Sequence, residues 1–195
     1  ELNTFFSNEV PGKGITDQES SGRCWLFTGT NVMRAKIIAD HNLPDFRLSQ
    51  VYLFFWDQLE KSNLFLQGVI DTRNKPMDDK MVEWLFKNPI GDGGQFTGIS
   101  DLTAKYGIVP LAIMPETYIS NNTSQFSRLL ESKLREYAIS LRDDKKSSVK
   151  ALIGKKEEML KTIYRMLATA YGEPPTEFDF AFKDKEGKYL SAPKH

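Results

Sequence analysis

The sequence predicts a mostly helical α+β protein, and three observations support this. Apolar residues recur at spacings of three and four through six segments, which is typical of amphipathic helices. Residues 178–182 alternate apolar and polar side chains, and a return strand begins at Tyr189 after a turn at 185–188. The 195-residue chain is 40% hydrophobic and 27% charged, which excludes a collagen-like, low-complexity or disordered chain.

The first two predicted helices follow a polar, turn-rich stretch of 23 residues. One starts near Cys24, where Ser20 or Ser21 can cap it, and ends at residues 41–44. The next runs from about residue 50 to residue 66, with Ser49 as its N-cap. Its first two turns are apolar on nearly all sides, so we expect it at the centre of the fold.

Four more helices are predicted downstream. The third begins around Pro76 and stops at residues 88–89. A glycine-rich turn at 91–94 precedes the fourth, which runs from about residue 95 to Tyr106 with Gly107 as its C-terminal cap. Two amphipathic helices then occupy residues 124–171.

Charge and composition exclude several functional classes. The 26 Lys and Arg residues balance 26 Asp and Glu residues, which gives no support for bulk attraction to nucleic acid or anionic lipid. No apolar run approaches the roughly 18–20 residues of a membrane helix. One cysteine excludes an internal disulfide and a cysteine-based zinc site, and we expect no metal and no cofactor.

Residues 131–170 hold ten Lys and Arg residues against six Asp and Glu residues. The simpler interpretation is a solvated helix face, because pairs such as Glu131 and Arg135 lie four residues apart. The alternative is a positively charged lining or a weak nucleic-acid contact.

Cys24 carries the sharpest chemical signal. It lies at the predicted start of a helix, where unpaired backbone N–H groups and the helix dipole stabilise a thiolate, the nucleophilic form. Gln18 lies six residues upstream and could fold back, so that its side-chain amide and the Cys24 backbone N–H form an oxyanion hole. The alternative is an inert, buried cysteine.

Gln18, Gly22, Cys24 and Trp25 together resemble the nucleophile signature of the papain-like cysteine peptidases. Ser21 stands where secreted relatives have a disulfide-forming cysteine, so the resemblance points to the intracellular branch, the bleomycin hydrolase and aminopeptidase C group. Four segments are similar to that group: residues 20–27 with 31–34, residues 48–50 with 52–57 and 59–63, residues 91–95, and residues 172–175 before a Phe-Asp-Phe strand.

The resemblance implies a role for each matching residue. Cys24 would be the nucleophile and Gln18 the oxyanion donor. Gly93 and Gly94 would line the cleft and pair through their backbones with an extended substrate, with Asp92 and Trp25 beside them in the substrate-binding set. Without the resemblance, the glycine turn reads as a plain loop between two helices.

The resemblance also implies a domain organisation. Residues 1–122 would form the helical, left-hand domain of a papain-like fold, and residues 123–173 an inserted helical subdomain. Residues 174–195 would be the first strands of a β-rich domain that is otherwise absent.

The histidines set the expected limits of activity. A papain-like enzyme needs a histidine and an asparagine after the cysteine, but the usual window, about residues 154–174, has no histidine. His41 and His195 read as surface groups. We therefore expect a fragment that lacks the catalytic histidine and asparagine and is nearly inactive alone.

The resulting hypothesis is a cysteine aminopeptidase that acts on peptides through a Cys24 thioester. The resemblance implies a cytoplasmic homohexamer, with the missing C-terminal domain as a partner and no membrane contact. No signal peptide is visible, although a removed one would leave the same picture. The alternative is a non-catalytic helical interaction or nucleic-acid-binding module on the same fold.

Overall fold

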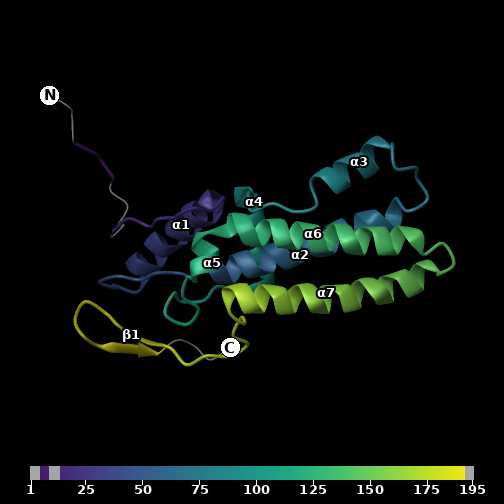
Figure 1. Ribbon diagram of the computed structural model, residues 1–195. Coiled ribbons are helices and arrows are strands. Elements are labelled where there is room, and N and C mark those ends of the chain that lie inside the picture. The colour runs from purple at the N-terminus through teal and green to yellow at the C-terminus, as the bar shows by residue number, and fades with distance from the viewer. Residues whose placement is uncertain (1–4, 9–13, 192–195) are drawn as a thin grey trace.

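In the computed structural model, residues 5–8 and 14–191 are described, and they form helices with one small sheet (Figure 1). The helices are α1 (Cys24–Asp40), α2 (Gln50–Asp71), α3 (Lys80–Lys87), α4 (Phe96–Tyr106), α5 (Tyr118–Asn121), α6 (Thr123–Asp143) and α7 (Val149–Tyr171), and the strands are β1 (Ala181–Lys183) and β2 (Tyr189–Ser191). The α+β prediction is confirmed.

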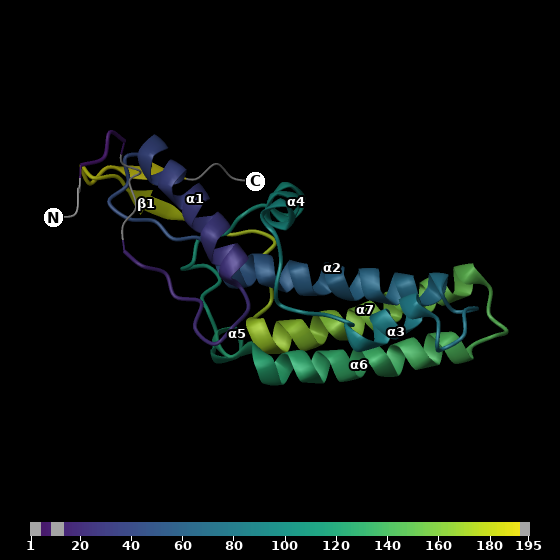
Figure 2. The same ribbon diagram turned by 90° about the horizontal axis from the view of Figure 1, so that it is seen from above.

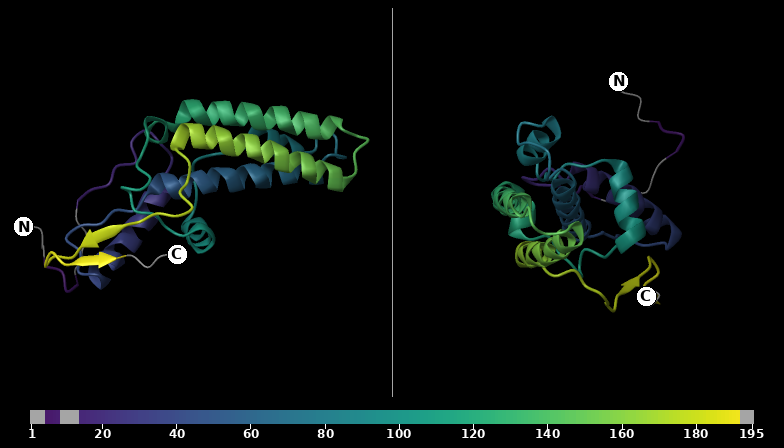
Figure 3. Two further views of the ribbon diagram at one scale, coloured as in Figure 1. Left: turned by 90° about the horizontal axis from the view of Figure 1, so that it is seen from below. Right: turned by 90° about the vertical axis from the view of Figure 1, so that its right-hand side faces the viewer.

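Three long helices, α2, α6 and α7, run side by side as an elongated bundle (Figure 2). Helix α1 lies at one end of this bundle, with α4 beside it (Figure 3). The strands lie at the end of α1 that is farther from the bundle. Helix α3 packs on the outside of α2. The bundle is therefore an extended body, and α1 meets it at one end.

Helix α2 is central, as predicted, because it packs against α1, α3, α4, α6 and α7. Four consecutive apolar side chains from its first turns are almost fully buried: Val51, Tyr52, Leu53 and Phe54. The helix continues to Asp71 rather than ending near Leu66, because Val69 and Ile70 also enter the core. Ser49 caps it as predicted, since its hydroxyl accepts a hydrogen bond from the Tyr52 backbone N–H.

Helices α6 and α7 bury their apolar stripes against α2. Leu134 of α6 and Leu167 of α7 have no exposed surface, and they belong to the same hydrophobic core as Leu26 of α1. The proposed division between residues 1–122 and 123–173 stays a prediction, and the two parts share this core.

Helix α1 starts at Cys24 as predicted, but its predicted cap is wrong, and so is the predicted start of α3. Neither Ser20 nor Ser21 caps α1, whose N-cap is Arg23, without a side-chain hydrogen bond. Helix α3 begins at Lys80 rather than near Pro76, because the Asp79 carboxylate caps it through the Met81 and Val82 backbone N–H groups. The four-residue α5 was not predicted.

The predicted strand pair forms an antiparallel hairpin in which Phe182 lies opposite Leu190. Its first strand begins at Ala181, later than the alternating pattern predicted. The hairpin packs on the loop after α1, where the Phe46 ring lies 6.1 Å from that of Phe182. The Lys185 backbone N–H also donates to the Asn42 carbonyl at 3.0 Å.

Candidate functional site

Cys24 is the first residue of α1, and it is exposed. The first N–H groups of a helix have no partner inside the helix, and no side chain caps them at α1. Helices α2, α3 and α7, by contrast, each begin with a side-chain cap. The thiol therefore lies beside backbone donors that carry the positive end of the helix dipole.

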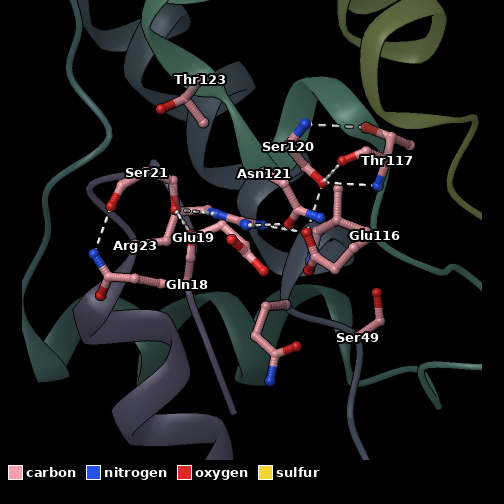
Figure 4. Close-up of polar contacts among 12 residues, drawn as sticks. Gln18, Glu19, Ser21, Arg23, Ser49, Glu116, Thr117, Ser120, Asn121 and Thr123 are labelled. Atoms are coloured by element: carbon pink, nitrogen blue, oxygen red, sulfur yellow. Dashed lines mark hydrogen bonds and ion pairs between the residues drawn. The ribbon is translucent and has the colours of Figure 1, made fainter.

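Arg23, the residue before the cysteine, is completely buried. Its guanidinium forms an ion pair with Glu116 at 2.7 Å and donates from Nε to the Ser21 hydroxyl at 2.9 Å (Figure 4). Glu116 in turn accepts a hydrogen bond from the Ser120 hydroxyl at 2.6 Å. Residues before α1 are thus joined to the segment that leads into α6.

Gln18 belongs to a closed loop with Ser21. The Gln18 side-chain amide donates to the Ser21 carbonyl, and the Ser21 hydroxyl donates back to the Gln18 carbonyl at 2.6 Å (Figure 4). An amide nitrogen has two N–H donors, so one remains for another acceptor. The loop also explains why Ser21 does not cap α1, since its hydroxyl serves Gln18 and Arg23.

The glycine turn lies against the start of α1. The Trp25 indole N–H donates to the Asp92 carbonyl at 2.9 Å, and the Gly22 backbone N–H donates to the Asp92 carboxylate at 2.9 Å. A Cβ atom on Gly94 would lie 2.4 Å from the Trp25 ring, so only glycine fits there without a shift. A Cβ atom on Gly93 would meet nothing within 4 Å.

Lys61 of α2 fixes the turn from its other side. Its ammonium group donates to the Asp57 carboxylate at 2.7 Å and to the carbonyls of Gly91 and Gly93 at 3.0 and 2.7 Å. These three acceptors match the three donors of a lysine. The same ammonium lies 5.4 Å from the Trp25 ring centre.

Asp92 and Asp57 respond differently to their surroundings. Burial acts to raise the pKa of Asp92, but hydrogen bonds from Thr123 and Gly22 and the charge of Lys61 outweigh it and hold that pKa below its ordinary value. Burial dominates at Asp57 and raises its pKa, although Lys61 opposes the shift. The Asp92 carboxylate is thus held by partners from the α1 loop and from α6, which indicates a scaffold role.

The structure brings Trp25, Asp92 and Gly94 together beside Cys24, with Gly93 in the same turn, and it joins Gln18 to the loop that leads into the cysteine. These contacts do not test the roles in substrate binding or catalysis, which stay predictions. His41 follows the last residue of α1, about 25 Å along the helix from Cys24. It packs edge-on against Phe182, and His195 lies outside the described residues.

Of the nine Lys and Arg residues in α6 and α7, four form ion pairs with acidic side chains, and one of these pairs joins Lys155 to Asp144. Ion pairs join Lys133 to Glu136, Arg135 to Glu131 and Lys161 to Glu158. A groove of 730 Å³ between α2 and α7 is lined by both acidic and basic side chains. This pairing favours the solvated-face interpretation over a nucleic-acid contact.

The described residues contain neither a membrane-spanning helix nor a cluster of metal ligands. None of the helices found there is long and apolar enough to cross a membrane. Within the same ranges, His, Cys, Asp and Glu side chains form no group of three or more that could hold a metal ion.

Sequence reasoning missed Arg23, Glu116, Asp57 and Lys61. The three bonded acceptors of Lys61 lie on two separate segments, and Glu116 is 93 residues from Arg23, so no local pattern shows these pairings. The only available signal was the position of Arg23 between Gly22 and Cys24.

Comparisons with known proteins extend over nearly the whole chain. The sequence profile of the Peptidase C1-like family matches residues 1–194. Aminopeptidase C from Listeria monocytogenes serovar 1/2a is 41% identical over 191 residues, which cover 96% of this chain and 42% of that protein. Human bleomycin hydrolase is 38% identical over 190 residues, covering 94% of this chain and 42% of that protein.

A solved structure, that of PepW from Lactobacillus rhamnosis HN001, superposes with a TM-score of 0.93 at 42% identity. The match covers 99% of this chain and 44% of PepW. The chain therefore spans less than half the length of these relatives.

Proposed function

Because the chain belongs to the Peptidase C1-like family, we propose that it carries the nucleophile of a cysteine aminopeptidase. The observation that carries the proposal is the exposed thiol of Cys24, the single cysteine, at a helix start without a side-chain cap. The relatives named aminopeptidase C and bleomycin hydrolase, about 40% identical, support the same class of enzyme.

The proposed reaction is acyl transfer to sulfur followed by hydrolysis. The Cys24 thiolate attacks the carbonyl carbon of the first peptide bond, a C–S bond forms, and the carbonyl oxygen becomes an oxyanion. The oxyanion collapses, the C–N bond breaks, and the leaving amine takes a proton from the protonated base. Water, which gives a proton to the same base, then attacks the thioester carbonyl, and the C–S bond breaks to release the acid and regenerate the thiolate and the protonated base.

Two donors are proposed for the oxyanion: the Cys24 backbone N–H and the second side-chain N–H of Gln18. Donors fixed before the reaction stabilise the developing charge without having to reorganise. The hydrogen-bonded loop around Gln18 and Ser21 supports this role, because it holds the Gln18 side chain in one orientation.

The glycine turn is the proposed substrate-binding edge. The open space beside Gly93 leaves its backbone accessible, while Trp25 and Asp92 support the turn from behind. The Gly93 carbonyl already accepts from Lys61, and a carbonyl oxygen has a second lone pair for a substrate N–H.

The general base must come from residues other than His41, which lies the length of α1 from the thiol. We propose that the histidine, and the asparagine that orients it, belong to a part of the protein that corresponds to the portion of the relatives that this chain does not cover. One stripe of α1 (Cys24, Thr28, Val32 and Lys36) is exposed along the helix, and this supports its being covered by such a part. The 195-residue chain alone should then be nearly inactive.

Peptides with a free amino end are the proposed substrates, and a cytoplasmic homohexamer is the proposed assembly. Exposed apolar side chains at and before α3, Met77, Met81 and Trp84, support subunit contacts. A single cysteine, which cannot form an internal disulfide, suits a reducing compartment.

The test is a chimera in which this chain replaces the matching part of the Listeria monocytogenes aminopeptidase C. We expect hydrolysis of aminoacyl p-nitroanilides with a free amine, and a loss of roughly 10³-fold or more for Cys24→Ala. N-acetylated substrates are the control for amino-end specificity. A folded chimera without activity, or activity that survives Cys24→Ala, would contradict the proposal.

A further inference from the structure

Arg23 is the largest completely buried side chain of the described residues, and it directly precedes the proposed nucleophile. Removing a guanidinium charge from water is costly, and good hydrogen-bonding geometry is needed to offset the cost. A buried arginine at this position therefore needs a physical explanation beyond packing.

The guanidinium joins the loop before α1 to residues 116–121 through three hydrogen bonds (Figure 4). It donates from Nη1 to Glu116 at 2.7 Å, from Nη2 to the Asn121 side chain at 3.4 Å, and from Nε to the Ser21 hydroxyl at 2.9 Å. The rings of Phe27 and Phe54 lie 5.2 and 5.5 Å from its central carbon. Rings and acceptors together leave the side chain a single orientation.

This arrangement extends to both proposed oxyanion donors. The Ser21 hydroxyl that accepts from Arg23 also donates to the Gln18 carbonyl, so the guanidinium holds the Gln18 loop through one intermediate. The main chain of Arg23 continues directly into the Cys24 N–H. Glu116 is itself anchored, since its second oxygen accepts from the Val51 backbone N–H of α2 at 3.1 Å.

We propose that Arg23 is a positioning residue that fixes the Gln18 side-chain amide and the Cys24 backbone N–H relative to each other. The inference rests on the proposed function, because it assigns a purpose to the two donors of the oxyanion hole. Oxyanion donors act through their geometry, so a shift of either one weakens the transition state more than substrate binding. Lysine cannot replace the planar fork that reaches Ser21 and Glu116 at once.

The kinetic test uses the active chimera with Arg23→Lys and Ser21→Ala. Both changes break the link between Arg23 and Ser21, and Ser21→Ala leaves the ion pair with Glu116 in place. We expect kcat to fall about tenfold or more in each, since losing one oxyanion donor costs roughly 10²–10³-fold, while KM stays within about twofold. The double variant should lose little more than either single one.

Arg34→Lys is the matched control. Arg34 is another buried arginine of α1, and it pairs at 2.6 Å with Asp45, which lies in the loop after α1 rather than in residues 18–23. We expect its kcat to stay within about twofold of the parent even if its melting temperature falls. Equal kcat losses for Arg34→Lys and Arg23→Lys, or an unchanged kcat for Arg23→Lys, would overturn the proposal.

Hydrogen–deuterium exchange on the 195-residue chain tests the same idea without activity. The Ser20 and Gly22 N–H groups are protected by bonds to the Asn121 carbonyl and the Asp92 carboxylate. We expect exchange at residues 18–24 to rise several-fold in Arg23→Lys and Ser21→Ala but not in Arg34→Lys. Unchanged exchange in Arg23→Lys and Ser21→Ala refutes the positioning role. If exchange rises in these variants but the parent chimera is inactive, only the proposed function is refuted.

Discussion

The two ends of the molecule are built on different principles. The bundle end, formed by α2, α6 and α7, has an interior mainly of leucine, phenylalanine and other apolar side chains, with Arg142 of α6 as a buried charged exception. The nucleophile end, where α1 meets residues 14–23, 91–94 and 116–123, buries Arg23 and holds Asp92 in a web of hydrogen bonds. Apolar burial has no preferred direction, whereas each buried polar group needs a partner at a defined angle and distance.

The two ends should therefore respond differently when a side chain is replaced. A side chain in the bundle contributes through the area that it removes from water, so its replacement should change the free energy of unfolding. A side chain at the nucleophile end contributes mainly by fixing donors and acceptors. Its replacement should therefore change the reactivity of the thiol or the loss of stability at low pH.

The largest expected effect on stability is in the bundle. Leu134 of α6 is completely buried in the shared core, so Leu134→Ala should lower the free energy of unfolding by about 2–5 kcal/mol. Urea unfolding followed by circular dichroism measures it. The control is Cys24→Ala, at an exposed site, which should change that free energy by less than about 0.5 kcal/mol. Similar losses for both would remove the distinction between the two ends.

Two neighbouring glycines at the nucleophile end should differ in how much their replacement costs. Gly94→Ala would place a Cβ atom 2.4 Å from the Trp25 ring, and we expect a cost of about 1–3 kcal/mol from the forced shift. Gly93→Ala meets open space and should be nearly neutral. Melting temperatures of the two variants measure the difference, and equal values would show that Trp25 does not pack on the turn.

Asp92 should contribute to the loss of stability at low pH. Its folded pKa lies below the unfolded value of about 3.9, so its contribution is present above that pH and is lost as the pH falls through the folded pKa. Asp92→Asn should therefore reduce the fall in melting temperature between pH 6 and pH 3. Asp57 has a raised pKa, so its contribution to stability changes with pH in the opposite direction. Because Asp57 is present in both proteins, the difference between Asp92→Asn and the parent reports the contribution of Asp92. An identical fall in parent and variant would contradict the expectation.

The smallest effect belongs to a helix cap at the far end of the bundle. The Ser148 hydroxyl accepts from the Ala151 backbone N–H at the start of α7, so Ser148→Ala should cost about 0.5–1 kcal/mol. The same chimera assay should show unchanged kcat. A change in kcat would mean that the bundle end is coupled to the thiol, contrary to the contrast drawn above.

Sequence periodicity predicted the long helices because each one buries a continuous apolar stripe. The central place of α2 followed from apolar residues around its first turns, and the Ser49 cap followed from its position before that stripe. Helix α5 is too short to show a period. The start of α3 depended on whether Pro76 or Asp79 initiates the helix, which local preference did not decide.

The residues of the candidate site also differ in whether the sequence predicts them. The sequence singles out Cys24 and Gln18 because their proposed chemistry depends on a short spacing and a helix start, and their roles stay predictions. The burial of Arg23 was not predicted, because its partners Glu116 and Asn121 lie 93 and 98 residues away, and an arginine in a loop ordinarily reads as exposed. The wrong cap assignment to Ser20 or Ser21 has the same origin, since the Ser21 hydroxyl is engaged by Arg23.

The exposed single thiol has a practical consequence for handling the protein. With no second cysteine in the chain, air oxidation of Cys24 can proceed to a disulfide only between two molecules. Each such covalent dimer blocks the Cys24 thiols of both molecules, and a reducing agent restores both. Non-reducing electrophoresis shows this disulfide-linked fraction directly as a band of doubled mass.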